Sequence, residues 1–258
     1  MISSCSVVRP SILPSQGSDP GSNPGGSIHL SVLVITFVRL RNLNLKEQYR
    51  SDRNDIISEF FLPCLTNCIQ YDRAIEFTTM KSLSTLSLGF ENSGKNSTKI
   101  RMITGHNFSI GDLNTLVKLF SRNGNGKLSL NNEFIRDAKI IKLKQIVNAG
   151  YLQMKIAIPN SEEVDGKFSE KIGIFRDEYD DIIAFSGTSN VTFDNQNRNF
   201  ESIDVFTSWN DRSRVKMKTD DFENLWTDST KSVQVYDFEF AERNNLLKYS
   251  PEWAADLN

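Results

Sequence analysis

The alternation of apolar and polar positions divides the chain into short segments of two kinds. Apolar residues recur three and four positions apart, as on one face of a helix, in Asp52–Ile69, Lys81–Phe90, Asp112–Phe120, Phe134–Ala149 and Asp211–Trp226. Short mixed or alternating runs typical of strands lie at Arg73–Thr78, Lys99–Thr104, Tyr151–Ile158, Lys171–Phe175, Ile182–Ser186 and Glu201–Phe206. Strands that alternate with helices predict a mixed α/β fold.

Two of these strands stand close together and predict a hairpin. The runs Lys171–Phe175 and Ile182–Ser186 are separated only by the acidic turn Arg176–Asp181. A separate signal marks the end of the longest helical pattern, Phe134–Ala149. Gly150 follows it directly and is expected to end that helix.

The N-terminal part of the chain has a different composition. Residues 10–26 are rich in Gly, Pro and Ser, and the apolar run from Val32 to Val38 is much shorter than the roughly 20 residues that a membrane-spanning helix needs. No basic region precedes this run, so it does not resemble a signal peptide. We expect a disordered leader at residues 1–45, one domain at 46–251 and a short tail at 252–258.

Composition and charge fit a single folded domain and say little about partners. The chain has 258 residues, of which 38% are hydrophobic, and its formal net charge is −2. No global basic field therefore attracts it to nucleic acid, and any such contact must come from a local patch. No basic amphipathic face indicates a membrane partner either.

Cysteine and histidine are too few for a structural metal site. Cys64 and Cys68 lie on an apolar helical stretch and are expected in the core, whereas a zinc site would need further ligands near them. The chain's histidines are His29 and His106. With neither a disulfide pattern nor an export signal, the sequence favours a reducing cytoplasm.

One loop has the spacing of a calcium site but lacks its charges. Ser121 and Asn132 stand at its first and last ligand positions, where carboxylates are needed. A flexible glycine-rich turn is the better interpretation, and the segment Gly124–Lys127 also lacks the pattern of a phosphate-binding P-loop.

The chemistry-bearing residues gather around the predicted hairpin. Ser169 and Lys171 stand at its start, the run Gly187–Asn190 follows its second strand, and Glu201 begins the next strand. Fixed Lys and Asn side chains are donors that can stabilise negative charge on a bound group.

The order of these segments resembles the nuclease branch of the phospholipase D superfamily. In that family a histidine, any residue and a lysine open a strand, then a glycine, a hydroxyl residue and an asparagine follow, and later an acid supports the histidine. The resemblance runs through DRAIEF, KIRMITGHNFS, IVNAGYLQMKIAIP, SEKIGIF, FSGTSN, NFESIDVF and DFENLW. It is similar to the domain that precedes helicase modules in bacterial and archaeal DNA-processing and restriction proteins.

The resemblance implies a fold, a site and a mode of assembly. The fold would be a phospholipase D-like mixed sheet sandwiched by helices, and the chemistry would need no cofactor or metal. The implied catalytic positions are Ser169, Lys171, Asn190 and Glu201, and the implied phosphate-binding residues are Lys171, Gly187, Thr188, Ser189 and Asn190. A single copy of the motif implies a homodimer that completes the site across its interface.

The sequence departs from the family pattern at the nucleophile. Ser169 stands where the attacking histidine belongs, and a serine hydroxyl needs an adjacent general base, for which the sequence offers only Lys171 or Glu201. Asp177 also stands one residue later than the family's aspartate. His106 is a candidate replacement acid or base, or an ordinary hydrogen-bonding histidine.

Two functions follow from this departure. The first is a nuclease-family domain that binds phosphodiesters, with DNA as ligand, and whose catalysis is impaired or lost. The second is a noncatalytic dimerisation or assembly module for a DNA helicase or restriction system.

Overall fold

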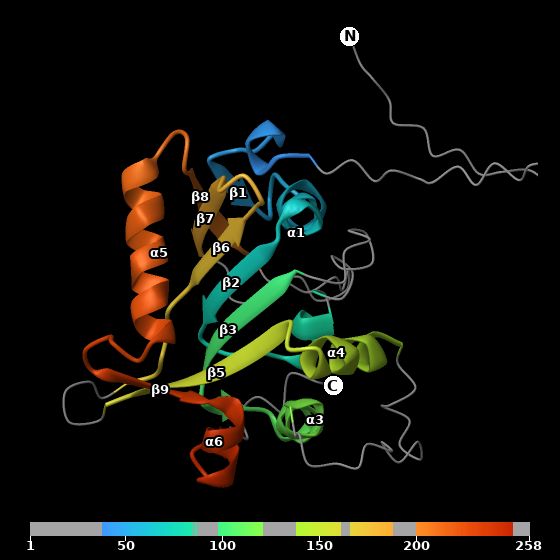
Figure 1. The fold of residues 1–258 in the computed structure, drawn as a ribbon, viewed down its shortest axis with the longest axis vertical. Coiled ribbons are helices and arrows are strands. Elements are labelled where there is room, and N and C mark those ends of the chain that lie inside the picture. Colours follow the sequence, from blue (N-terminus) through green and yellow to red (C-terminus); the bar gives the residue numbers. More distant parts are fainter. Residues whose placement is uncertain are drawn as a thin grey trace, which may run out of the picture. The chain divides into compact units, whose positions relative to one another are not determined.

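The computed structural model describes residues 38–84, 86, 98–120, 138–160, 166–187 and 200–249. Within these ranges the chain forms an eight-stranded sheet in the order β1-β8-β7-β6-β2-β3-β5-β9 (Figure 1). The strands are β1 (Gln48–Arg50), β2 (Gln70–Ile75), β3 (Lys99–Gly105), β5 (Leu152–Pro159), β6 (Ile172–Arg176), β7 (Ile182–Gly187), β8 (Ser202–Thr207) and β9 (Val233–Asp237). A small parallel pair joins β4 (Asn107–Phe108) to β10 (Lys248–Tyr249).

The sheet is parallel in one part and antiparallel in the rest. Strands β2, β3 and β5 run parallel to one another, whereas β6, β7, β8 and β1 pair antiparallel, as does the edge strand β9 with β5. The start of β6 therefore lies beside the carboxyl end of β2, and the loops that leave β2 and β3 meet the loop that enters β6. Among the described residues, this edge holds Lys171, Gly187 and Glu201.

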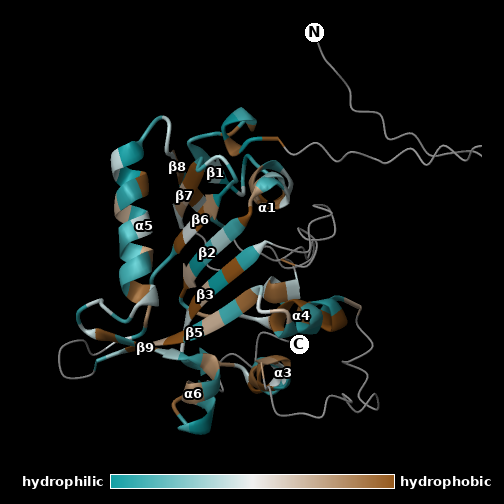
Figure 2. Ribbon diagram, viewed as in Figure 1, coloured by the Kyte–Doolittle hydropathy of each residue, from teal (hydrophilic) through white to brown (hydrophobic). Residues whose placement is uncertain are grey.

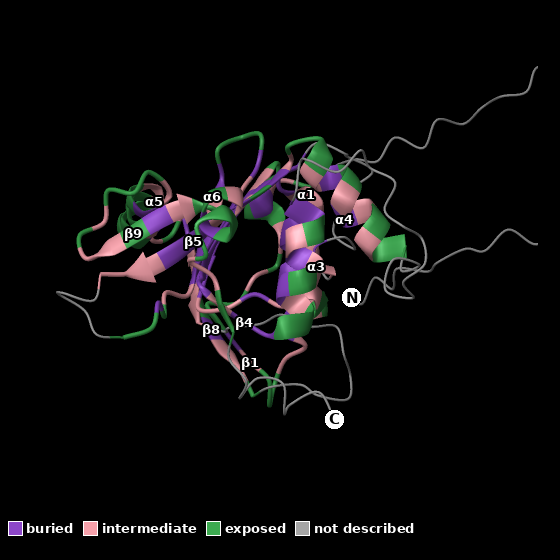
Figure 3. Cartoon of the chain, turned by 90° about the horizontal axis from the view of Figure 1, so that it is seen from below, coloured by how far each residue is buried: buried purple, intermediate pink, exposed green. Residues whose placement is uncertain are grey.

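Helices cover both faces of the sheet. The 15-residue helix α5 (Arg212–Trp226) packs on one face through Val215, Phe222 and Leu225. The other face is covered by α1 (Leu62–Asn67), α3 (Ile110–Phe120), α4 (Ala138–Asn148) and α6 (Phe238–Arg243), with the short turns η1 (Leu40–Asn42) and η2 (Ile57–Phe61). Figure 3 shows buried residues on the strands and exposed residues on the outer sides of these helices. The predicted α/β class, a mixed sheet between helices, is confirmed.

The two faces have separate cores because side chains alternate along each strand. On the α5 face the core combines small and aliphatic side chains such as Ala74 and Ile103 with Phe168 and Phe222. On the opposite face it is rich in aromatic rings, and Phe175 stacks on Tyr71 with ring centroids 4.5 Å apart. Cys64 and Cys68 are buried in that second core, as predicted, and burial raises the pKa of the Cys64 thiol.

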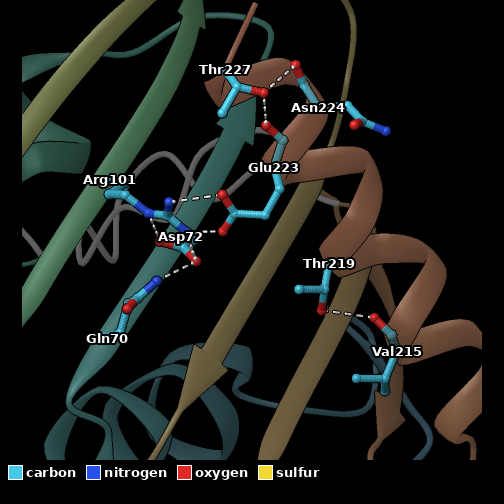
Figure 4. A network of polar contacts seen from close by, with 8 residues as sticks. All are labelled: Gln70, Asp72, Arg101, Val215, Thr219, Glu223, Asn224 and Thr227. Carbon is cyan, nitrogen blue, oxygen red and sulfur yellow. Dashed lines mark hydrogen bonds and ion pairs between the residues drawn. The ribbon is translucent and has the colours of Figure 1, made fainter. Parts of the chain in front are cut away.

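A polar network ties α5 to the sheet (Figure 4). The Arg101 guanidinium of β3 donates to both oxygens of Asp72 at 2.7 Å, and to both oxygens of Glu223 on α5 at 2.6 and 3.1 Å. The same guanidinium lies 5.1 Å from the ring of Phe222. Figure 2 shows the visible side of α5 to be largely hydrophilic. The helix therefore lies at the surface, and the contacts of Arg101 hold its inner side against the sheet.

Local signals account for the ends of several helices. Asp211 accepts a hydrogen bond from the backbone N–H of Arg214 at 3.2 Å and caps α5, where the sequence predicted the helix to begin. Gly150 has a φ of +77° after α4, which is the conformation of the predicted C-terminal glycine. The predicted helix Lys81–Phe90 is described only in part, and residues 80–84 are helical.

The packed part of the chain begins before residue 46. Leu40 is fully buried in the core, and its backbone N–H donates to the Asp177 carboxylate at 2.9 Å. Arg39 and Arg41 each pair with Asp181 at 2.9 Å. The described residues 38–45, which the sequence analysis assigned to the leader, therefore pack against the domain. The strand β9 and the helix α6 were also not predicted from the sequence.

Candidate functional site

The β6–β7 hairpin brings Lys171 and Gly187 together at one edge of the sheet. Lys171 directly precedes β6 and Gly187 ends β7, and the Gly187 N–H donates to the Lys171 carbonyl at 3.3 Å. Gly187 also pairs with Ile203 on β8, and Glu201 directly precedes that strand. Three of the predicted site residues therefore lie at the same end of three neighbouring strands. Thr188, Ser189 and Asn190 fall outside the described residues.

Gly187 occupies a position that only glycine fits. Its φ is +106°, and a Cβ atom built there would lie 2.3 Å from the Ser202 carbonyl oxygen. The two strands approach too closely at this point for any side chain. The glycine therefore has a structural reason that does not depend on ligand binding.

Ser169 is exposed and faces a carboxylate that the sequence analysis did not identify. Its hydroxyl donates to Glu76 Oε2 at 3.4 Å, a long hydrogen bond. Glu76 directly follows β2, and its carbonyl oxygen accepts from the Gly105 N–H at 3.1 Å. Glu76 reaches the site because β2 is the neighbour of β6 in the sheet. Nothing in the local pattern around Glu76 marks it as a site residue.

Glu201 interacts electrostatically with a buried arginine. Arg73 on β2 is 3% exposed, and its guanidinium lies 4.9 Å from the centroid of the Phe185 ring. Burial lowers the pKa of Arg73, and the charges of Tyr71 and Glu201 oppose that shift. In the resemblance, Glu201 supports a histidine. Here its field acts on Arg73 instead, a residue that the sequence analysis assigned only to a strand.

Asp177 is a structural residue of the hairpin turn. It is 3% exposed, and its carboxylate accepts hydrogen bonds from the backbone N–H groups of Tyr179 and Asp181 at 2.9 Å, in addition to that of Leu40. The carboxylate therefore shapes the turn that holds β6 and β7 in register.

His106 follows β3 and is largely enclosed. It is 7% exposed, and its Nδ1 has no hydrogen-bond partner in the described part of the chain. Burial lowers the pKa of His106, the charge of Lys248 lowers it further, and a hydrogen bond with the Ala157 backbone opposes both. The strand order places β3 two strands from β6, about 10 Å at the usual strand spacing. His106 is therefore near Lys171 but is not its direct neighbour.

A hollow of about 540 Å³ adjoins Ser169. It lies between the segment that leads into β6, the end of α5 and the loop from α5 to β9. A larger hollow of about 700 Å³ lies beside residues 43–48 and the turn from β8 to α5. That turn follows the opposite end of β8 from Glu201. We therefore associate only the smaller hollow with the candidate site.

No protein-family model and no curated protein sequence matches the chain. Among solved structures, NucT from Helicobacter pylori is similar, with a TM-score of 0.40 and 12% sequence identity over 73% of this chain and 97% of NucT. A likeness at this level carries no inference about function.

Two classes of feature do not occur in the described ranges. No group of three or more His, Cys, Asp or Glu residues there could hold a metal ion. None of the helices described is long and apolar enough to cross a membrane.

Proposed function

We propose that this chain is a cytoplasmic, phospholipase D-like nuclease-family domain that binds phosphodiesters, with DNA as its ligand, and that Ser169 makes it catalytically impaired or inactive. The observation that supports this most is the meeting of Lys171, Gly187 and Glu201 at one edge of the sheet. An amine held at such an edge stabilises the charge on a phosphate oxygen.

The surroundings of Ser169 support the loss of catalysis. Attack on phosphorus needs a nucleophile that loses its proton easily, and a serine hydroxyl needs a strong base for that. The Ser169 hydroxyl donates to the Glu76 carboxylate at 3.4 Å, and a carboxylate is a weak base whose negative charge repels an approaching phosphate. Lys171 would then bind the phosphodiester without completing a reaction.

The proposal includes a homodimer. One chain offers a single set of motif residues, so a second copy related by a twofold axis would supply the other half of the site. A helicase or restriction subunit would be a further partner in the same system.

The nuclease experiment uses the purified full chain with a chelator present. We expect no cleavage of single-stranded DNA by the wild-type chain or by Ser169→Ala, and measurable cleavage by Ser169→His. Because the expected chemistry uses no metal, the gain should persist in the chelator. Failure of Ser169→His to cleave, while it remains folded and binds DNA, would contradict the catalytic part of the proposal.

The binding experiment uses Lys171→Ala. We expect it to weaken DNA binding at low salt by about 5- to 20-fold, since a contact to a charged group contributes roughly 1–2 kcal/mol. Lys99→Ala is the matched control, because Lys99 is an exposed lysine at the opposite end of β3. A wild-type chain that ignores DNA at low salt would instead favour the assembly module, and sizing of that chain would then test dimerisation.

A further inference from the structure

Arg73 and Lys171 lie on the same face of the sheet. Arg73 on β2 pairs with Gly173 on β6, and side chains alternate along a strand, so Lys171, two positions before Gly173, shares the face of Arg73. This face carries the aromatic core, because the Arg73 guanidinium lies 4.9 Å from the centroid of the buried Phe185 ring. Helix α5 covers the opposite face.

Gly173 gives the Phe185 ring its place beside Arg73. A Cβ atom built on Gly173 would collide with the ring, so only glycine lets the ring cover β6 at this point. The Arg73 guanidinium rests on the same ring. Phe185 stands two positions before Gly187 on β7, roughly 7 Å along the strand, and the Gly187 N–H donates to the Lys171 carbonyl. The guanidinium therefore lies on a ring that belongs to the hairpin of the candidate site.

Glu201 supplies negative charge to this buried guanidinium. Arg73 is 3% exposed, and a buried cation costs free energy unless negative charge lies near it. Tyr71 and Glu201 act on Arg73 in this sense. Burial raises the pKa of Tyr71 to about 12, so its phenol is uncharged at neutral pH. Glu201 directly precedes β8 at the edge that holds Lys171, and its Oε1 atom is buried.

We infer that Arg73 is a positioning residue of the phosphate site, because it neutralises Glu201 and leaves Lys171 to hold the phosphate. The inference rests on the proposed function and adds how the charge of the site is set. Without Arg73, the Glu201 carboxylate would repel a phosphate and attract the Lys171 amine. Two cations and one carboxylate leave one net positive charge, which matches the single negative charge of a phosphodiester.

The test measures how tightly a short oligothymidylate binds the full chain, and how that affinity depends on salt. Arg73→Met removes a positive charge and should weaken binding at low salt about tenfold, with a shallower salt dependence. Glu201→Gln removes the negative charge and should tighten binding about threefold. In the double variant the two effects should cancel, and the affinity should return to within about twofold of the wild-type value.

Arg101→Met is the matched control for the loss of an inward-facing arginine. Arg101 lies on the neighbouring strand β3, but it pairs with Asp72 and Glu223 on the α5 face. Its loss should lower stability and leave the DNA affinity of the folded chain unchanged. Urea denaturation of each variant shows that the chain is folded under the conditions of the binding measurement.

The outcomes separate this inference from the proposed function. If Arg73→Met binds as tightly as the wild type, or if Glu201→Gln does not restore its affinity, the inference is overturned and the proposed function stands. If Arg73→Met does not fold, Glu201→Gln alone decides, because a carboxylate with a merely structural role would leave affinity unchanged or lower. If the wild-type chain does not bind the strand, the proposed function fails and this inference fails with it.

Discussion

Ser169 and Glu76 show how a single position changes the chemistry of this edge of the sheet. A histidine at residue 169 would offer a nitrogen nucleophile, whereas the hydroxyl present there donates to the Glu76 carboxylate at 3.4 Å. Glu201, the expected support of that histidine, interacts with the buried Arg73. The Gly187 N–H donates to the Lys171 carbonyl, so these two residues lie together at the same edge. The proposed function therefore predicts phosphate binding without phosphate transfer at this edge.

The lowered pKa of His106 predicts that stability depends on pH. Its pKa is lowered in the folded chain, so the folded state holds the imidazole neutral, while the unfolded state takes up a proton near pH 6.5. The unfolded state then binds more protons below about pH 7, and stability falls on acidification. We expect the free energy of unfolding to decrease between pH 7.5 and 5.5, as measured by urea denaturation. His106→Gln should flatten this slope, and an unchanged slope would show that His106 does not cause it.

Arg101 on β3 ties helix α5 to the sheet, because it pairs with Asp72 on β2 and with Glu223 on α5. The Asp72 side chain is 6% exposed and depends on Arg101 for its charge balance, whereas the Glu223 side chain on the helix is 46% exposed. Lys155 adds a second tie, because its amine donates to the Trp226 carbonyl at 2.8 Å. The helix is therefore held where its C-terminal end forms a wall of the hollow beside Ser169.

Substitution of Arg101 and substitution of Glu223 should lower the free energy of unfolding by very different amounts. Arg101→Met leaves the buried Asp72 carboxylate without its guanidinium and should lower the free energy of unfolding by about 3–5 kcal/mol. Glu223→Gln removes only an exposed partner and should cost about 0–1 kcal/mol. Chemical denaturation of both variants tests this. Similar losses of stability in the two variants would mean that the buried Asp72 carboxylate does not require the Arg101 charge.

At the scale of the whole molecule, the segment before β1 is part of the folded unit. Leu40 is fully buried, and Leu43 and Leu45 pack against the same core. The Leu40 N–H donates to the Asp177 carboxylate, and Arg39 and Arg41 form ion pairs with Asp181. Both aspartates lie in the hairpin turn that supports the site. Because this hairpin also positions Lys171, the segment and the candidate site are structurally connected.

Two truncations compare the predicted domain boundary with the observed packing. A chain that starts at residue 46 should be less stable than one that starts at residue 38 by at least about 2 kcal/mol, from the loss of Leu40 burial alone. Leu40→Ala in the longer chain should cost about 2–5 kcal/mol and identifies that side chain as the main cause. Equal midpoints for the two truncations in thermal or urea denaturation would support the predicted boundary at residue 46.

The sequence by itself determined the local elements and one contact of the site. Periodicity and caps placed α5, β3, β5 and the β6–β7 hairpin, because helices, strands and tight turns depend on residues a few positions apart. The hairpin brings Lys171 and Gly187 together across a short turn, so their pairing could be predicted as well.

Only the tertiary structure decided which distant residues join them. Glu76 and Arg73 reach the site because β2 pairs with β6, about a hundred positions later in the chain, and no local pattern encodes that pairing. The contact of Leu40 with the hairpin turn likewise joins segments that are distant in the sequence. So does the wall that α5 and the start of β9 form beside Ser169. Burial, charge and close approach between distant segments arise only when the sheet assembles, so they had to be read from the fold.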